Sequence, residues 1–141
     1  MRDLRRFFLA GLAYLLPTFP LGYLWHLNWF HARYEQLQMY RAEVIIPMGL
    51  GSMLIQAVIY AALYPRLFAG RTWMRGALGF GLTFGTLAWS LAVLPVAAKY
   101  RTASVADFVA LESAFTVLHY LVVSPLIALA WRGAAEPRNA A

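Results

Sequence analysis

The sequence predicts an all-α membrane protein with four transmembrane helices and short loops. Of its 141 residues, 62% are hydrophobic and only 13% are charged, whereas soluble domains carry about 25% charged residues. Four apolar runs are each long enough to cross a bilayer, which takes about 20 residues per helix. No polar stretch between them is long enough to fold by itself. We therefore expect one transmembrane domain over residues 1–141.

The first predicted span covers residues 7–30 and follows a basic amino terminus. Its apolar stretch is longer than that of a signal peptide, and no small-residue cleavage site follows it, so we interpret it as a span. Pro17 and Pro20 lie near its middle. Because proline lacks a backbone donor and clashes with the preceding turn, we expect a kink or a break there. Trp25 and His26 lie towards the far end of this span.

The second predicted span, residues 44–68, follows the longest loop. In that loop, residues 31–43, three apolar side chains recur at helical spacing and predict a short helix at the membrane surface: Tyr34, Leu37 and Tyr40. Within the span, Gln56 belongs to a face of small and polar residues, because steps of three and four positions return to one side of a helix.

The third predicted span, residues 77–98, is rich in glycine. Gly81 and Gly85 form a small-x-x-x-small pattern, which lets another helix approach closely. Trp89 lies one turn further along the span. We expect its side chain, like that of Trp25, to lie inside the bundle, where the two indoles could form aromatic walls for a ligand.

The fourth predicted span, residues 108–131, carries a polar seam. At about 100° per residue, its hydrophilic side chains fall within one arc: Glu112, Ser113, Thr116, His119, Tyr120 and Ser124. An ionisable residue in a span is costly, so it usually faces a bundle interior or a wet cavity. We expect Glu112 in the first turn of its helix, where the helix dipole favours a carboxylate. It would either pair there with Lys99 or Arg101, or line a polar pocket.

The distribution of basic residues predicts the orientation. The amino terminus, the 66–75 loop and the tail carry Arg2, Arg5, Arg6, Arg66, Arg71, Arg75, Arg132 and Arg138. The other two loops carry only Arg33, Arg41, Lys99 and Arg101. Because loops rich in Lys and Arg stay in the cytoplasm, we expect both termini in the cytoplasm of a bacterial inner membrane. The net charge of +6 then reflects topology, and we expect no nucleic-acid partner.

The two halves of the chain share a loose pattern. Each begins with arginine before an apolar span, reaches a basic-Tyr pair, and returns through a span with Ser and Tyr to another arginine. This pattern is compatible with a parallel duplication of a helical hairpin. The stretch GYLWHLNWF, the glycine-rich third span and the terminal Ala130-Trp131-Arg132 together resemble uncharacterised bacterial inner-membrane proteins with four spans. That resemblance covers most of the chain and implies no substrate or catalytic residue.

The residue set excludes several kinds of chemistry. Without cysteine there is no disulfide, thiolate nucleophile or sulfur-ligated metal. No span has the Glu-x-x-His motif or two histidines at a helical repeat. Glu112 and His119 lie about 10.5 Å apart along one helix, too far to share a metal ion. We expect no metal site, although one histidine from each of two spans, such as His26 and His119, could still bind a haem.

Two classes of function remain. The first is a protein that binds or transports a small molecule or ion in an intramembrane cleft, lined by Trp25, His26, Gln56, Trp89, Glu112 and His119. Because four helices enclose little water, transport would require a homodimer. The second is a non-catalytic accessory subunit of a larger membrane complex. An enzyme ranks third, since no catalytic set is recognisable. In each case the lipid bilayer is the surrounding partner.

Overall fold

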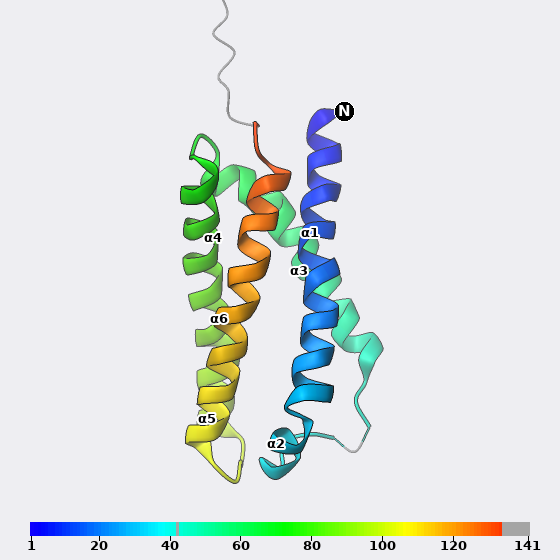
Figure 1. Ribbon diagram of the computed structural model, residues 1–141, viewed down its shortest axis with the longest axis vertical. Coiled ribbons are helices and arrows are strands. Elements are labelled where there is room, and N and C mark those ends of the chain that lie inside the picture. Colours follow the sequence, from blue (N-terminus) through cyan, green and yellow to red (C-terminus); the bar gives the residue numbers. More distant parts are fainter. Residues whose placement is uncertain (42, 134–141) are drawn as a thin grey trace, which may run out of the picture.

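The computed structural model describes residues 1–41 and 43–133, so Arg138 and the tail around it lie outside the described part. The described residues form helices and no strands (Figure 1). Four helical segments are long and apolar enough to cross a membrane, which confirms the predicted all-α fold with four spans. The elements are α1 (Arg2–Leu24), the π-helical turn η1 (Trp25–Trp29), α2 (His31–Gln36), α3 (Ile46–Phe68), α4 (Trp73–Ala88), the π-helical turn η2 (Trp89–Val93), α5 (Leu94–Lys99) and α6 (Val105–Ala130).

Helix α1 is not broken at its two central prolines. It continues through Pro17 and Pro20 and departs from α-helical geometry only at η1, where the N–H of Phe30 donates to the Trp25 carbonyl at 3.1 Å. The third span has a similar turn at η2, directly before Pro95. A proline ring clashes with the carbonyl four residues earlier. That carbonyl belongs to η2, and the wider π-helical turn gives it room to move aside.

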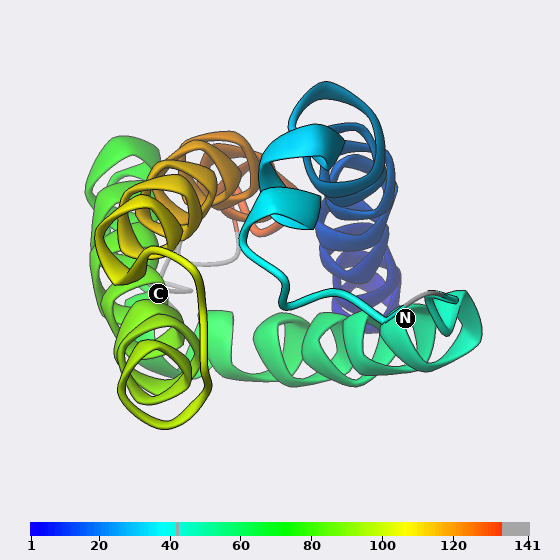
Figure 2. The same cartoon turned by 90° about the horizontal axis from the view of Figure 1, so that it is seen from below.

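Three spans run side by side, and α3 is strongly tilted relative to them. Seen from below, α1, α4 and α6 appear nearly end-on, whereas α3 lies across the view (Figure 2). Helix α6 packs along both α1 and α4, and α1 also packs along α3. Helix α3 meets α4 near the loop that joins them, where a Cβ built on Gly76 would collide with the Tyr64 hydroxyl. Away from that loop, α3 diverges from α4 and leaves space inside the bundle.

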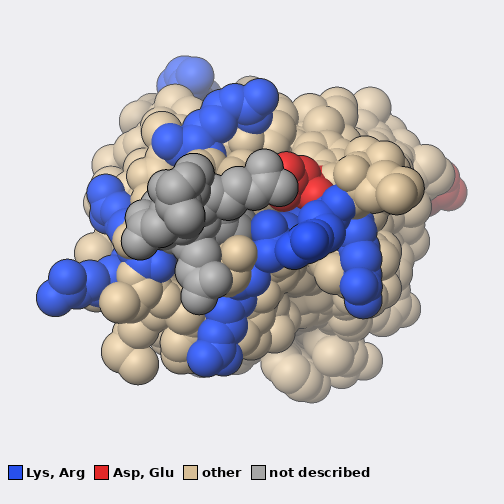
Figure 3. All heavy atoms as spheres, turned by 90° about the horizontal axis from the view of Figure 1, so that it is seen from above, with Lys and Arg blue, Asp and Glu red and all other residues tan. Residues whose placement is uncertain are grey.

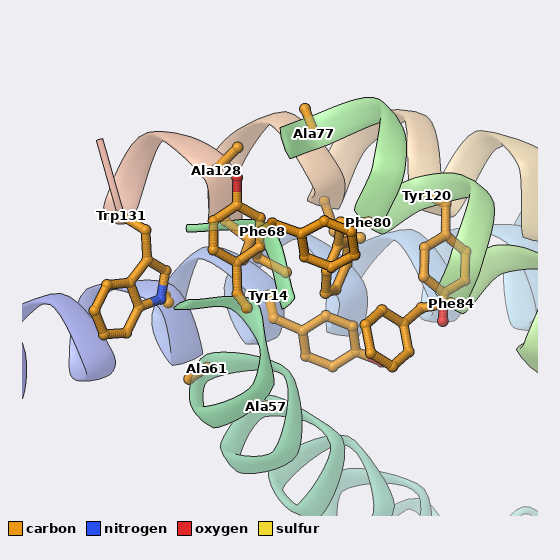
Figure 4. Packing of buried hydrophobic residues seen from close by; sticks show 14 residues of the cluster. Tyr14, Ala57, Ala61, Phe68, Ala77, Phe80, Phe84, Tyr120, Ala128 and Trp131 are labelled. Carbon is orange, nitrogen blue, oxygen red and sulfur yellow. The ribbon is translucent and has the colours of Figure 1, made fainter. Parts of the chain in front are cut away.

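The main core is aromatic and lies where the four spans converge. Buried rings of α1, α3, α4 and α6 meet there, among them Tyr14, Phe68, Phe80 and Tyr120 (Figure 4). A second cluster lies at the opposite end of the bundle, beside α2 and α5, and consists of Trp25, Tyr34, Leu37, Val93 and Phe108. The helix expected in the longest loop is thus present as α2, and Tyr34 and Leu37 fold back from it onto the spans.

Helices α4 and α6 come close together at the predicted glycine pair. A Cβ built on Gly81 would lie 2.8 Å from Ser124 Oγ, and one on Gly85 would lie 3.3 Å from the Tyr120 ring. The first distance is shorter than real Cβ contacts. Any larger residue at Gly81 would therefore force Ser124 or one of the two helices to shift, so the small-x-x-x-small pattern serves packing within the chain.

Candidate functional site

A cavity of about 890 Å³ lies between the four spans, on the side where α3 diverges from α4. Residues of α1, η1, α3, α4, η2 and α6 line it, together with five residues of the loop before α3: Met39, Tyr40, Arg41, Val44 and Ile45. Most of the lining is apolar. The polar and ionisable lining residues are Tyr14, Thr18, Tyr23, His26, Tyr40, Arg41, Ser52, Gln56, Tyr60, Glu112, Thr116, His119 and Tyr120.

A hydrogen-bonded network in the middle of the cavity wall joins three spans. The Thr18 hydroxyl donates to the Tyr14 carbonyl at 2.6 Å, so its oxygen must accept the second hydrogen bond, from His119 Nε2 at 2.9 Å. This fixes a proton on Nε2 of the buried His119 ring. The Tyr14 hydroxyl donates in turn to Gln56 Oε1. Helix α1 is thereby bonded to α6 on one side and to α3 on the other.

Two tyrosines close the deep end of the cavity. The hydroxyl oxygens of Tyr60 on α3 and Tyr120 on α6 lie 2.7 Å apart. The Tyr60 ring also packs edge-on against Tyr14, with ring centroids 5.1 Å apart. These contacts connect the cavity wall to the aromatic core.

At the other end of the cavity, Glu112 lies beside a histidine and a tyrosine. Its Oε1 accepts a hydrogen bond from the Tyr34 hydroxyl at 2.6 Å and lies 3.4 Å from His26 Nε2. The expectation that Glu112 occupies the first turn is wrong, because α6 already begins at Val105. The dipole of the helix end is therefore weaker at Glu112 than expected, and η1 and α2 supply its partners in place of Lys99 or Arg101.

Burial and the hydrogen bond to Glu112 raise the pKa of Tyr34 well above that of a free tyrosine. Tyr40, stacked on Tyr34 with centroids 4.8 Å apart, has its pKa raised mainly by burial and also by the Glu112 charge. Tyr34 therefore remains protonated at ordinary pH and is a constant donor to Glu112.

The structure brings four of the six predicted cleft residues to the cavity wall: His26, Gln56, Glu112 and His119. Trp25 does not line the cavity. Its ring is buried in the second cluster, against Phe30 and Phe115. Trp89 also lies elsewhere, because its Nε1 donates to Ser113 Oγ at 2.8 Å on the other side of α6. We expected both indoles inside the bundle, but the sequence does not indicate which neighbouring helix each of them meets.

Trp89 belongs to a separate, apolar groove of about 600 Å³ between α4 and α6. The groove runs over the close contact at Gly81 and Gly85 and also includes Ser113 and Ser124. The polar seam of α6 is thus divided between two surfaces. Glu112 and His119 face the cavity, Ser113 and Ser124 face the groove, and Thr116 and Tyr120 border both.

Three important residues were not among the predicted cleft residues: Thr18, Tyr34 and Tyr14. Thr18 and Tyr14 lie four positions apart, which places them on one face of a helix, and this spacing was the available signal. Nothing local indicates that Tyr34 reaches Glu112, because that contact depends on how α2 folds back.

The described residues contain no group of three or more His, Cys, Asp or Glu side chains that could hold a metal ion. No protein-family model, curated protein or solved structure matches the chain. The candidate site therefore rests on the geometry of these residues alone.

Proposed function

We propose that this chain is a small integral membrane protein that binds a small molecule inside its bundle of four spans. The cavity carries this proposal. Its volume of about 890 Å³ lies within the range of about 300–1,000 Å³ that is typical of ligand pockets, and it combines an apolar lining with a few polar groups, as such pockets do.

The polar lining supports binding over a purely structural role. Polar side chains on membrane-spanning helices are costly unless they have hydrogen-bond partners or face water. Gln56, on α3, is exposed although it belongs to a span, and its side chain lines the cavity. His26 and Glu112 are also partly exposed there. These groups offer hydrogen bonds to a ligand that reaches the space between the helices.

We also propose that both termini lie in the cytoplasm of a bacterial inner membrane. Lys and Arg gather at the end of the bundle that holds the amino terminus and the end of α6 (Figure 3). In the described residues this end has seven arginines and one acidic residue, Asp3, whereas the opposite end has four basic and four acidic residues. In this orientation Glu112, His26 and the 39–45 loop lie towards the periplasm.

Reporter fusions test this orientation. A fusion after Arg71 should report the cytoplasm and one after Gln38 the periplasm. The reverse pattern would contradict the orientation. A third fusion, after Arg138, is expected to report the cytoplasm; that position lies outside the described residues.

Two glycines of α3 provide a matched test of the cavity. Gly49 lines it and Gly51 does not, yet a Cβ at either position would meet no atom within 4 Å. We expect Gly49→Phe to fill the mouth of the cavity and weaken binding of an uncharged amphiphile, 4-phenylbutanol, while Gly51→Phe leaves binding unchanged. Calorimetric titration in lipid nanodiscs, with empty nanodiscs as the blank, measures the difference. Equal behaviour of both variants would contradict ligand binding and favour an accessory subunit.

A further inference from the structure

The two oxygens of the Glu112 carboxylate have different surroundings. Oε1 is occupied by the Tyr34 hydroxyl and faces His26 Nε2. Oε2 accepts no hydrogen bond from any described residue, and it is not among the fully enclosed polar atoms that lack a partner. Because Glu112 lines the cavity, Oε2 is accessible to a ligand there.

The geometry of His26 implies that a proton neutralises this carboxylate. His26 Nδ1 lies 2.9 Å from the Gly22 carbonyl, and a carbonyl can only accept, so Nδ1 must carry a hydrogen. In a neutral ring Nε2 is then a bare acceptor, yet it faces Glu112 Oε1 at 3.4 Å. Two facing acceptors repel each other unless a positive charge lies at the pair, either as a proton on one of them or as a cation bound to the carboxylate. Without a bound cation, the His26–Glu112 pair therefore holds one proton.

The charged and titratable groups around the pair are few. They include Tyr34 on α2, Tyr40 and Arg41 on the loop before α3, and His119 on α6. From α3, the neutral Gln56 also lines the cavity. Glu112 is the only acidic residue among the described cavity-lining residues. Arg41 is the only Lys or Arg among them and is exposed on the loop.

Aromatic rings lie beside the His26–Glu112 pair. The ring centroids of Phe115 and His26 lie 4.4 Å apart edge to face, and those of Tyr34 and His26 lie 5.0 Å apart. Phe115 and Tyr40 line the cavity next to Glu112. A carboxylate oxygen among aromatic faces attracts an organic cation, because ring faces and carboxylate both carry negative potential.

We propose that the cavity binds a monovalent organic ammonium compound with an apolar body, in exchange for the proton of the His26–Glu112 pair. The ammonium group contacts Glu112 Oε2, and the apolar body occupies the aliphatic part of the cavity. As the cation binds, His26 Nε2 releases its proton to water, so the charge of the cavity does not change. The inference rests on the proposed function and specifies the class of its ligand.

Three probes of similar shape test this: 4-phenylbutylammonium, 4-phenylbutanol and 4-phenylbutyrate. In nanodiscs near neutral pH the ammonium probe should bind about tenfold more tightly than the alcohol, and the carboxylate should bind most weakly. Titration in two buffers of different ionisation enthalpy should show release of up to about one proton per bound cation. Equal binding of ammonium and alcohol, or tightest binding of the carboxylate through Arg41, would overturn the proposal.

Two substitutions on α6 localise the effect. Glu112→Gln should reduce binding of the ammonium probe to the level of the alcohol and abolish proton release, while Asp107→Asn, which removes an exposed carboxylate outside the cavity, should change neither. A cation preference that survives Glu112→Gln would refute the assignment. If that variant does not fold, His26→Gln must still abolish proton release. If the alcohol binds and Gly49→Phe blocks it, but no cation preference appears, the ligand class fails and the proposed function stands.

Discussion

Adding one methyl group at Gly81 should show how tightly α4 and α6 pack. The new Cβ would lie 2.8 Å from Ser124 Oγ and 3.4 Å from Ser124 Cβ, and the buried serine side chain is too short to move far aside. Overpacking of this kind costs about 1–3 kcal/mol. Replacing glycine by alanine in a helix returns up to about 1 kcal/mol. We therefore expect Gly81→Ala to lower the free energy of unfolding by about 1 kcal/mol.

Gly11→Ala in α1 is the matched control, because a Cβ there meets nothing within 4 Å. It should be neutral or stabilising. Ser124 Oγ is buried without a hydrogen-bond partner in the described structure, and an unsatisfied hydroxyl costs about 1–3 kcal/mol. Ser124→Ala should therefore be neutral or stabilising, and it should rescue Gly81→Ala, because it removes the atom that the new methyl group meets.

Unfolding in mixed micelles, followed by tryptophan fluorescence over an SDS titration, measures all four proteins in the cycle. The double variant should recover most of the loss, so that the two substitutions are not additive. Close packing of α4 on α6 at Gly81 is refuted if Gly81→Ala is as well tolerated as Gly11→Ala, or if Ser124→Ala gives no rescue.

Two further predictions concern hydrogen bonds that join the spans. Folding raises the pKa of Tyr34, so the stabilising contribution of its hydroxyl is present below about pH 10 and is lost as the pH rises above the pKa of a free tyrosine. Tyr34→Phe should therefore make the fall in unfolding free energy above about pH 10 less steep. An unchanged slope would contradict the burial of this hydroxyl. Thr18→Val and His119→Phe should each cost roughly 0.6 kcal/mol in the same micelle assay, and the double variant should cost no more than one of them, whereas additive losses would show that the two side chains act separately.

Apolar length and helical periodicity predicted much of this structure. The four spans follow from hydropathy, because a bilayer requires about 20 apolar residues per helix. The close approach at Gly81 and Gly85 follows from residue size, and the inward seam with Glu112 and His119 follows from the angular repeat of a helix. Each of these features is local to one helix, so the sequence of that helix is sufficient to indicate it.

Features that depend on how the helices are rotated and tilted were not predictable in the same way. The pairing of His26 with Glu112 requires η1 and α6 to face each other at one height, and the contact of Tyr34 requires α2 to fold back. Trp25 is buried in the second cluster and Trp89 lines the groove between α4 and α6, so neither lines the cavity. The prolines of α1 were also misleading in part, since the helix continues through Pro17 and Pro20.

Cysteine accessibility on α3 tests most directly whether water reaches a cavity between the four spans. The chain has no cysteine, so a single introduced thiol has no background. Gln56 lines the cavity, whereas its neighbour Ile55 is 63% exposed and does not line it. In a bilayer we expect Ile55 to meet lipid. A water-soluble, membrane-impermeant thiol reagent added from the side of α2 should modify Gln56→Cys rapidly and leave Ile55→Cys unmodified. An unreactive Gln56→Cys, or equal reaction of both variants, would contradict the cavity.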